Sequence, residues 1–278
     1  MGKNKEKVCL FVKPFKNDDD MRGNRFHDEV ITDFFRKGFR IERAMYYRFT
    51  PKMLLAHYDE LVREGREKIV HRMIGDYVSP KFAEKLLNGG KLTEEELNTP
   101  GRPVVVFDFV VPSKFARYTD FRDDVHPNPN RPTEVVEGTI ENTRKYLVGP
   151  TKLLTFDTAI EKFGLKEGVE AYIAASNAFR AKYQYTGVGA NDGFNVMHCS
   201  ANHTDYLYES NNFFNLWVDQ GIKLNADMLN EYYEHRAQTT ESPDQFQVLA
   251  IARGASSVEP AYFDVDRFAM ESISGADM

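Results

Sequence analysis

One histidine in this sequence has neighbours that could support chemistry at its ring. His198 lies in the apolar segment FNVMHCS at 194–200, Ser200 follows it, and Glu209 falls on the helix expected next. A neutral imidazole has an unperturbed pKa near ~6.5 and is a nucleophile at neutral pH, because no second base has to remove a proton from it. The residue types therefore allow a nucleophilic histidine, although a histidine in this position is more often a packing residue. The alternative is a histidine that only packs at the end of an apolar strand.

A second histidine, His203, raises the alternative of a metal site. Two histidines close in sequence can bind zinc, but the spacing from His198 to His203 does not suit one face of a helix. No third ligand is placed convincingly, and Cys9 and Cys199 are too few and too far apart for a metal-binding pair. The sequence therefore predicts no protein-bound metal, and we expect both cysteines to be buried thiols.

The composition limits the class of protein. The chain has 278 residues, of which 42% are hydrophobic and 28% charged, as is ordinary for a globular protein with a substantial core. No apolar run approaches the roughly 20 residues of a membrane helix, and the start does not read as a secretory signal, so we expect a cytoplasmic protein without a membrane partner. The net charge of -6 argues against a nucleic-acid partner, because phosphate backbones are bound by clustered lysine and arginine.

Apolar strands alternate with helical segments along the chain. We expect strands at 8–13, 39–49, 103–111 and 194–198, and helices at 24–39, 51–63, 133–147, 158–180 and 202–218. The prolines of HPNPNRP indicate a long surface loop at 113–132. This order predicts an α/β (α+β) fold, a ferredoxin-like sandwich with an antiparallel sheet and helices on the sheet. No GxGxxG or GxxxxGK[ST] follows a strand, so the phosphate loops of Rossmann and P-loop folds are excluded.

Several segments, taken in order, resemble the nucleoside diphosphate kinase family. They are FVKPF at 11–15, KGFRIERAMYYRFTPKMLLAHYDEL at 37–61, PVVVFDF at 103–109, LVGPT at 147–151, and FNVMHCS at 194–200 followed by Glu209. The spacing Asn-x-x-His-x-Ser with the later Glu is the most specific of these features. The resemblance covers the first sixty or so residues and short islands after them, in a chain nearly twice the family's usual length.

The resemblance implies that His198 takes the γ-phosphate of a nucleoside triphosphate and returns it to a nucleoside diphosphate. Glu209 would orient the ring, with Ser200 linked to it, and Lys13 would place a positive charge on the transferring phosphate. The remaining nucleotide-binding and phosphate-binding positions implied by the family are Tyr58, Arg144 or Lys145, Thr151, Arg180 and Asn195. Mg²⁺ would arrive bound to the nucleotide phosphates.

Two departures from the family bear on substrate binding. Lys145 occupies the aligned arginine position, while Arg144 lies one residue earlier, so either the phosphate clamp is weaker or Arg144 replaces it. The family's Pro-Phe-Phe segment after Tyr58, whose ring stacks on the base, is replaced by REGREKIV. Met73, Tyr77 or Phe82 could substitute for it, and we expect weak, broad use of nucleotides with phosphate contacts dominating.

The length predicts additions to a kinase-like core. We expect the core at 1–218, with insertions at about 64–102, 113–132 and 152–178, and a C-terminal extension at 219–278. Two other functions stay open: a phosphotransferase or phosphohydrolase with another acceptor, and an inactive nucleotide-binding or interaction protein. The phosphate-facing positions match better than the base-facing ones, which favours an enzyme. A homo-oligomer is also left open.

Overall fold

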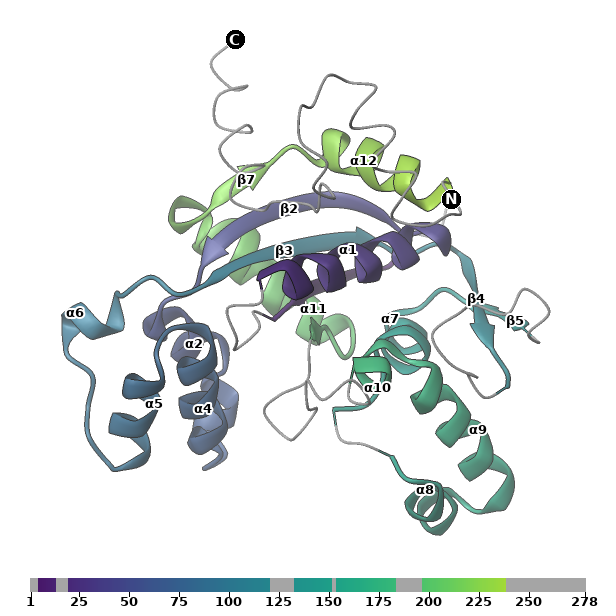
Figure 1. Ribbon diagram of the computed structural model, residues 1–278, viewed down its shortest axis with the longest axis horizontal. Helices are drawn as coiled ribbons and strands as arrows, with labels where there is room; N and C mark the ends of the chain where they lie inside the picture. The colour runs from purple at the N-terminus through teal and green to yellow at the C-terminus, as the bar shows by residue number, and fades with distance from the viewer. Residues whose placement is uncertain (1–4, 14–19, 121–132, 152–153, 184–196, 239–278) are drawn as a thin grey trace.

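The computed structural model describes residues 5–13, 20–120, 133–151, 154–183 and 197–238 (Figure 1). Its centre is a five-stranded sheet with the strand order β6-β1-β3-β2-β7. The strands are β1 (Lys7–Val12), β2 (Arg40–Arg48), β3 (Pro103–Val110), β6 (Met197–Cys199) and β7 (Ile222–Leu224). Every neighbouring pair is antiparallel.

The connections between these strands make the fold ferredoxin-like. The path from β1 to β2 runs through α1 (Asp20–Arg36) and skips the position of β3, while the path from β3 to β6 skips β1. Two such crossovers, joined through β2 and β3, form the split βαβ arrangement of a ferredoxin-like sandwich. The predicted fold class is therefore confirmed by the strand order itself.

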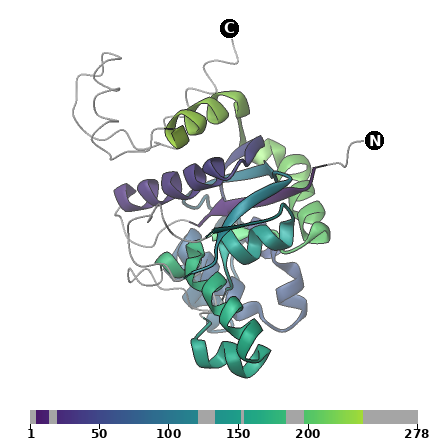
Figure 2. The same cartoon turned by 90° about the vertical axis from the view of Figure 1, so that its right-hand side faces the viewer.

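The alternation of side chains along β3 separates the two faces of the sheet. Phe109 stacks on Phe34 of α1 at 5.4 Å between ring centroids. Asp108 points to the opposite face, where Tyr206 of α11 (His203–Asn211) donates a hydrogen bond to it at 3.3 Å. Because neighbouring residues of a strand face opposite sides, α1 and α11 cover different faces of the sheet, as Figure 2 shows.

Helices between β2 and β3 form a group at one end of the molecule (Figure 1). They are α2 (Pro51–His57), α3 (Asp59–Arg63), α4 (Glu67–Tyr77), α5 (Pro80–Leu87) and α6 (Glu94–Leu97). The Thr50 hydroxyl accepts a hydrogen bond from the Met53 amide and caps α2, while Pro51 supplies a first helical residue that needs no amide partner. This local sequence sets the start of the helix whose other end reaches the candidate site.

A second group lies between β3 and β6. It contains β4 (Lys114–Tyr118), β5 (Thr133–Glu137), α7 (Ile140–Thr143), a π-helical turn (Arg144–Val148), α8 (Phe156–Phe163), α9 (Leu165–Asn177) and α10 (Phe179–Tyr183). The predicted loop at 113–132 is wrong over β4, and the predicted helix at 133–147 is wrong over β5. Among the described residues, these two strands pair only with each other, and a long connection separates them in the sequence, so neither five-residue segment shows its partner in the local sequence pattern.

The segment after α11 joins the central sheet. A π-helical turn (Asn212–Leu216) and a short 3-10 helix (Val218–Gln220) lead into β7, which pairs with β2, and α12 (Ala226–Gln238) then packs against α1. The division of the chain at residue 218 stays a prediction. Among the described residues, no helix is long and apolar enough to cross a membrane.

Candidate active site

His198 lies in the middle of the short edge strand β6. Its Cα is paired with that of Phe11 on β1, and its ring stacks on the Phe11 ring with centroids 4.6 Å apart and planes 11° apart. The imidazole is 15% exposed, so one edge remains accessible while the rest packs against the sheet. Packing on a buried aromatic ring holds the orientation of the imidazole.

Glu209 of α11 binds the other edge of this ring. Its Oε1 lies 2.7 Å from Nε2 of His198, and its Oε2 accepts a hydrogen bond of 2.6 Å from the Ser200 hydroxyl. Burial raises the pKa of Glu209, but the electrostatic interaction with His198 and hydrogen bonds from His198 and Ser200 outweigh it, so the net pKa is lowered. An ionised carboxylate can only accept hydrogen bonds, so we assign the proton to Nε2 and the lone pair to Nδ1. The predicted His198, Ser200 and Glu209 are thus brought together.

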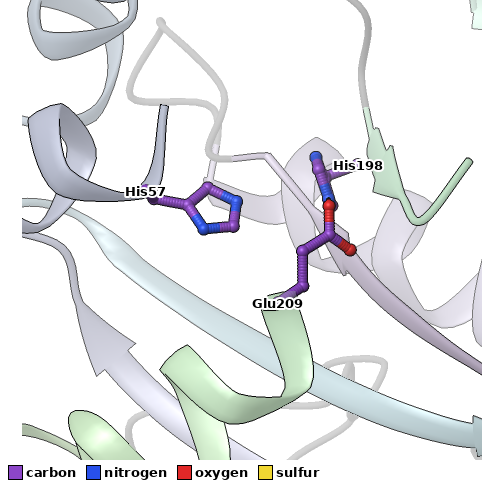
Figure 3. Close-up of side chains that lie close together, drawn as sticks. All are labelled: His57, His198 and Glu209. Atoms are coloured by element: carbon purple, nitrogen blue, oxygen red, sulfur yellow. The ribbon is translucent and has the colours of Figure 1, made fainter. Parts of the chain in front are cut away.

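Two residues from the end of α2 border His198. The Tyr58 hydroxyl lies 3.5 Å from Nδ1 of His198, and the ring centroid of His57 lies 5.5 Å from that of His198. Figure 3 shows the His57 ring pointing toward Glu209 and His198. Burial, followed by the charge of His198, lowers the pKa of His57 to about 3, so this ring is neutral at physiological pH.

His57 is a residue of the site that the sequence did not predict. Its ring is 8% exposed, and its Nδ1 has no hydrogen-bond partner among the described residues. The available signal was helical spacing, because His57 falls on the same buried face of α2 as Met53 and Leu54. That spacing places the residue in the interior without showing that His198 is its neighbour.

Cationic side chains gather beside the strand that carries His198. Arg180 of α10 is 4% exposed and donates to the carbonyls of Gly149 at 2.7 Å and Met197 at 2.8 Å, and its Nε has no partner among the described residues. Burial and the nearby Arg144 lower the pKa of Arg180 to about 10. Burial, together with the charge of Arg180, lowers the pKa of the half-buried Lys13 to about 7. Both shifts come first from burial and second from a neighbouring arginine, so a bound anion would stabilise the charged forms of Lys13 and Arg180.

The structure distinguishes the two candidates for the second arginine position. Arg144 donates to the Cys199 carbonyl at 3.0 Å, next to His198. Lys145 is exposed, and its ammonium lies 4.9 Å from the centroid of the Tyr146 ring instead. Arg144 is therefore the side chain directed toward the candidate site.

The structure shows no contact with His198 for the other predicted positions that it describes. Thr151 is half-buried just beyond Gly149, and its role stays a prediction, while Asn195 lies outside the described residues. Met73 and Tyr77, two of the suggested base-stacking residues, are 3% and 1% exposed within the core, so neither offers a free face to a base. Phe82 is half-buried against the same core.

These residues define a class of site: a buried His-Glu-Ser array on an edge strand of a ferredoxin-like sheet, with cationic side chains beside it. No family model matches the chain, and no curated protein matches it. Three solved structures similar to it are nucleoside diphosphate kinases, the family that the sequence motifs resemble.

The first is the Aquifex aeolicus enzyme in an orthorhombic crystal form, at 20% identity over 76% of this chain and 95% of that one, with a TM-score of 0.38. The second, from Borrelia burgdorferi, is a transition-state mimic with bound vanadate and ADP, at 19% identity over 82% and 97% of the two chains, with a TM-score of 0.37. The third is the apo enzyme of Encephalitozoon cuniculi, at 13% identity over 75% and 88%, with a TM-score of 0.36.

Proposed function

We propose that this protein is a nucleoside diphosphate kinase-like phosphotransferase that works through phospho-His198. The observation that carries the proposal is the orientation of the imidazole. Glu209 holds Nε2, the lone pair is assigned to Nδ1, and a group of cationic side chains lies beside the ring. A buried carboxylate that accepts from one ring nitrogen directs the nucleophilic lone pair to the other.

The reaction follows from this geometry in two transfers. Nδ1 of His198 attacks the γ-phosphorus, the new N–P bond forms, and the bond from phosphorus to the bridging oxygen breaks, so the nucleoside diphosphate leaves with that electron pair. The positive charge that develops on the imidazole is balanced by Glu209, and Ser200 holds the second carboxylate oxygen. A second nucleoside diphosphate then attacks the phosphohistidine and restores the neutral ring.

Phosphate binding is assigned to Lys13, Arg144 and Arg180. Fixed positive charges in a partly dry site stabilise the transferring phosphoryl group without reorganisation. We assign no protein ligand to Mg²⁺, because this ion prefers a shell of oxygen atoms and the described site offers one carboxylate beside two imidazoles. Bound to the nucleotide phosphates, the ion would neutralise part of their charge. Tyr58, Thr151 and Asn195 complete the proposed nucleotide site.

The test is phosphorylation of the purified full-length chain with γ-labelled ATP. We expect an acid-labile, base-stable phosphate on the parent protein and none on His198→Ala, because no other histidine that the structure describes has the same contacts. His203→Ala, which changes an exposed histidine close in sequence, is the matched control and should be labelled like the parent. Equal labelling of His198→Ala would refute the assignment.

The acceptor is identified by a chase with unlabelled nucleoside diphosphates. Transfer of the label to GDP, CDP or UDP supports the kinase. Release of the label as inorganic phosphate at the same rate with and without diphosphates would instead identify a phosphohydrolase. A parent protein that binds nucleotide but never becomes labelled would identify a binding protein without turnover.

A further inference from the structure

His57, His198 and Glu209 form a set of metal-ligating side chains. One ring nitrogen from each histidine and one carboxylate oxygen lie within 4.8 Å of one another. The three residues come from different elements, the end of α2, the edge strand β6 and helix α11, and they converge as Figure 3 shows. The fold, and not the local sequence, brings these three side chains together.

The chemistry of the set suits zinc. Two imidazoles and one carboxylate, with a fourth position left for water, are the ligands of a common class of zinc site, whereas magnesium prefers a shell of oxygen atoms. We propose that His57, His198 and Glu209 bind one Zn²⁺ ion, and that the bound ion withdraws His198 from phosphoryl transfer. The metal site is inferred from the geometry of the three side chains. Only its effect on phosphoryl transfer rests on the proposed function.

The present separations allow zinc to enter with small side-chain movements. Zinc ligands at about 2.0–2.2 Å in a tetrahedral arrangement lie about 3.3 Å from each other. The His198 nitrogen and the Glu209 oxygen are 2.7 Å apart, and the whole set lies within 4.8 Å, so movements of about an ångström or less bring the three atoms to these distances.

Other contacts of the three side chains favour a metal ion. Ser200 donates to the second oxygen of Glu209 and would hold the carboxylate in place, as outer hydrogen bonds do in metal sites. Nδ1 of the buried His57 has no partner among the described residues, although a buried ring nitrogen usually has one. The phosphotransfer mechanism makes no use of His57, whereas a metal site does.

Zinc and phosphate compete for the same imidazole. If the metal binds Nε2, the proton now on Nε2 moves to Nδ1, so the ring stays a neutral imidazole and Nδ1 no longer carries the lone pair that attacks phosphorus. If the metal binds Nδ1, it covers the lone pair that attacks phosphorus. Either arrangement lowers the nucleophilicity of His198, so zinc is expected to inhibit formation of the phosphoenzyme.

Direct binding tests the site. Metal-free, untagged, full-length protein is titrated with zinc by calorimetry, and we expect one equivalent whose affinity falls by about a hundredfold or more in His57→Phe and His57→Gln. His203→Ala is the matched control and should bind like the parent. Failure of the parent to bind zinc, or unchanged affinity in a folded His57 variant, overturns the proposal.

A second measurement uses the parent protein alone, so its result does not depend on whether the variants fold. X-ray absorption of the zinc-loaded parent should show two imidazole ligands, and a spectrum with none or one overturns the proposal. Labelling by γ-labelled ATP is then measured with and without zinc, each protein relative to its own zinc-free rate. Full labelling at saturating zinc overturns the inhibitory effect, whereas zinc binding in a parent that is never labelled refutes the proposed function and leaves the metal site standing.

Discussion

Lys13 is the residue whose charge depends most directly on what occupies the candidate site. In the free protein, burial and the neighbouring Arg180 lower its pKa to about 7, far below the ordinary value of 10.5. A bound phosphate favours the ammonium form and therefore raises this pKa. At a pH between the pKa of Lys13 in the free protein and its higher pKa in the complex, the lysine is largely neutral before binding and charged after it. Nucleotide binding must then take up a proton.

We predict this uptake in calorimetric titrations of ADP at pH 8. The apparent enthalpy should vary with the ionisation enthalpy of the buffer in the direction of proton uptake, and affinity should fall by up to about tenfold for each pH unit above 7. Lys13→Met should abolish the uptake, whereas Lys145→Met, a change of an exposed lysine outside the cluster, should retain it. Proton uptake of the same size in Lys13→Met would contradict the placement of Lys13 at the phosphates.

Three of the site residues that the sequence predicted belong to one short pattern, Asn-x-x-His-x-Ser with a later Glu. His198, Ser200 and Glu209 could be named in this way, and the structure joins them through two hydrogen bonds. His57 could not, because its relation to His198 exists only after α2 has been placed against the edge strand. Local spacing shows that a side chain is buried, but it does not show which side chain from a distant segment it meets.

At the scale of elements, a π-helical turn contains both Arg144 and Lys145. The Gly149 amide donates to the Arg144 carbonyl at 2.8 Å, a bond that spans one residue more than in an α-helix. Arg144 and Lys145 are adjacent on this turn, but Arg144 reaches the Cys199 carbonyl whereas Lys145 lies over the Tyr146 ring, and the local sequence does not show this difference. Single π turns of this kind occur often at functional sites.

Gly149 ends this turn in a conformation that disfavours other residues. Its φ is +88°, and a Cβ there would lie 2.5 Å from the Cβ of Ala178. Its carbonyl also accepts from Arg180. The chain therefore needs glycine for its backbone angle and for the close approach, and the same residue helps to position a proposed phosphate ligand.

We predict that Gly149→Ala is more destabilising than Gly164→Ala. Gly164 has a φ of +79°, but a Cβ added there would have no atom within 4 Å, so its substitution tests the backbone angle alone and should cost about 1 kcal/mol. The contact with Ala178 should add roughly 1–3 kcal/mol at Gly149. Urea unfolding measures both free energies, and equal losses in the two variants would mean that the close contact relaxes without cost.

The strand prediction succeeded and failed for one physical reason. β1 and β3 are central strands buried on both faces, so their sequences KVCLFV and PVVVFDFV are apolar and recognisable alone. β4 and β5 are mostly accessible and, in the part of the chain that the structure describes, pair only with each other, so their sequences carry no such run. β7 contains three residues and depends on β2 for its conformation. The strands that the sequence did not predict are therefore those whose conformation depends on pairing with another strand.

At the scale of the whole molecule, α12 joins the outer layer of the sheet. The Asn230 side chain accepts from the Ile41 amide at 2.9 Å and donates to its carbonyl at 2.8 Å, so it continues the hydrogen bonding of β2 beyond the strand pairs. Tyr233 is fully buried, and its hydroxyl donates to Asp28 of α1 at 3.3 Å. These contacts connect the end of the described chain to its first helix and to its sheet.

His27 lies where these layers meet. Its ring centroid is 5.5 Å from that of Phe107 in the sheet, and its Nδ1 is 3.5 Å from the hydroxyl of Tyr233 in α12. Burial lowers the pKa of His27 from 6.5 to about 4. The unfolded chain therefore binds this proton more tightly than the folded protein does, and protonation of His27 favours unfolding.

The sign of the effect follows from the two pKa values. Above pH 6.5 the ring is neutral in both states, and the stability associated with it is fully present; it is lost as pH falls from 6.5 toward 4, the folded value. Between pH 7 and pH 5 this linkage amounts to about 2 kcal/mol of unfolding free energy. His27→Phe keeps a ring in the layer without the titrating nitrogens, and it leaves the Tyr233 hydroxyl its bond to Asp28.

We therefore predict that the parent loses about 2 kcal/mol more than His27→Phe when urea unfolding is compared at pH 7 and pH 5. His57, whose pKa is lowered to about 3, contributes the same loss to both proteins and cancels in the comparison. Thr32→Val is the matched control, since it changes another buried polar residue of α1 without altering any titration, and it should keep the parent's difference between the two pH values. If parent and His27→Phe lose equal free energy, the His27 ring is not held neutral between these layers, and the contact of α1 with the sheet and α12 is looser than the distances indicate.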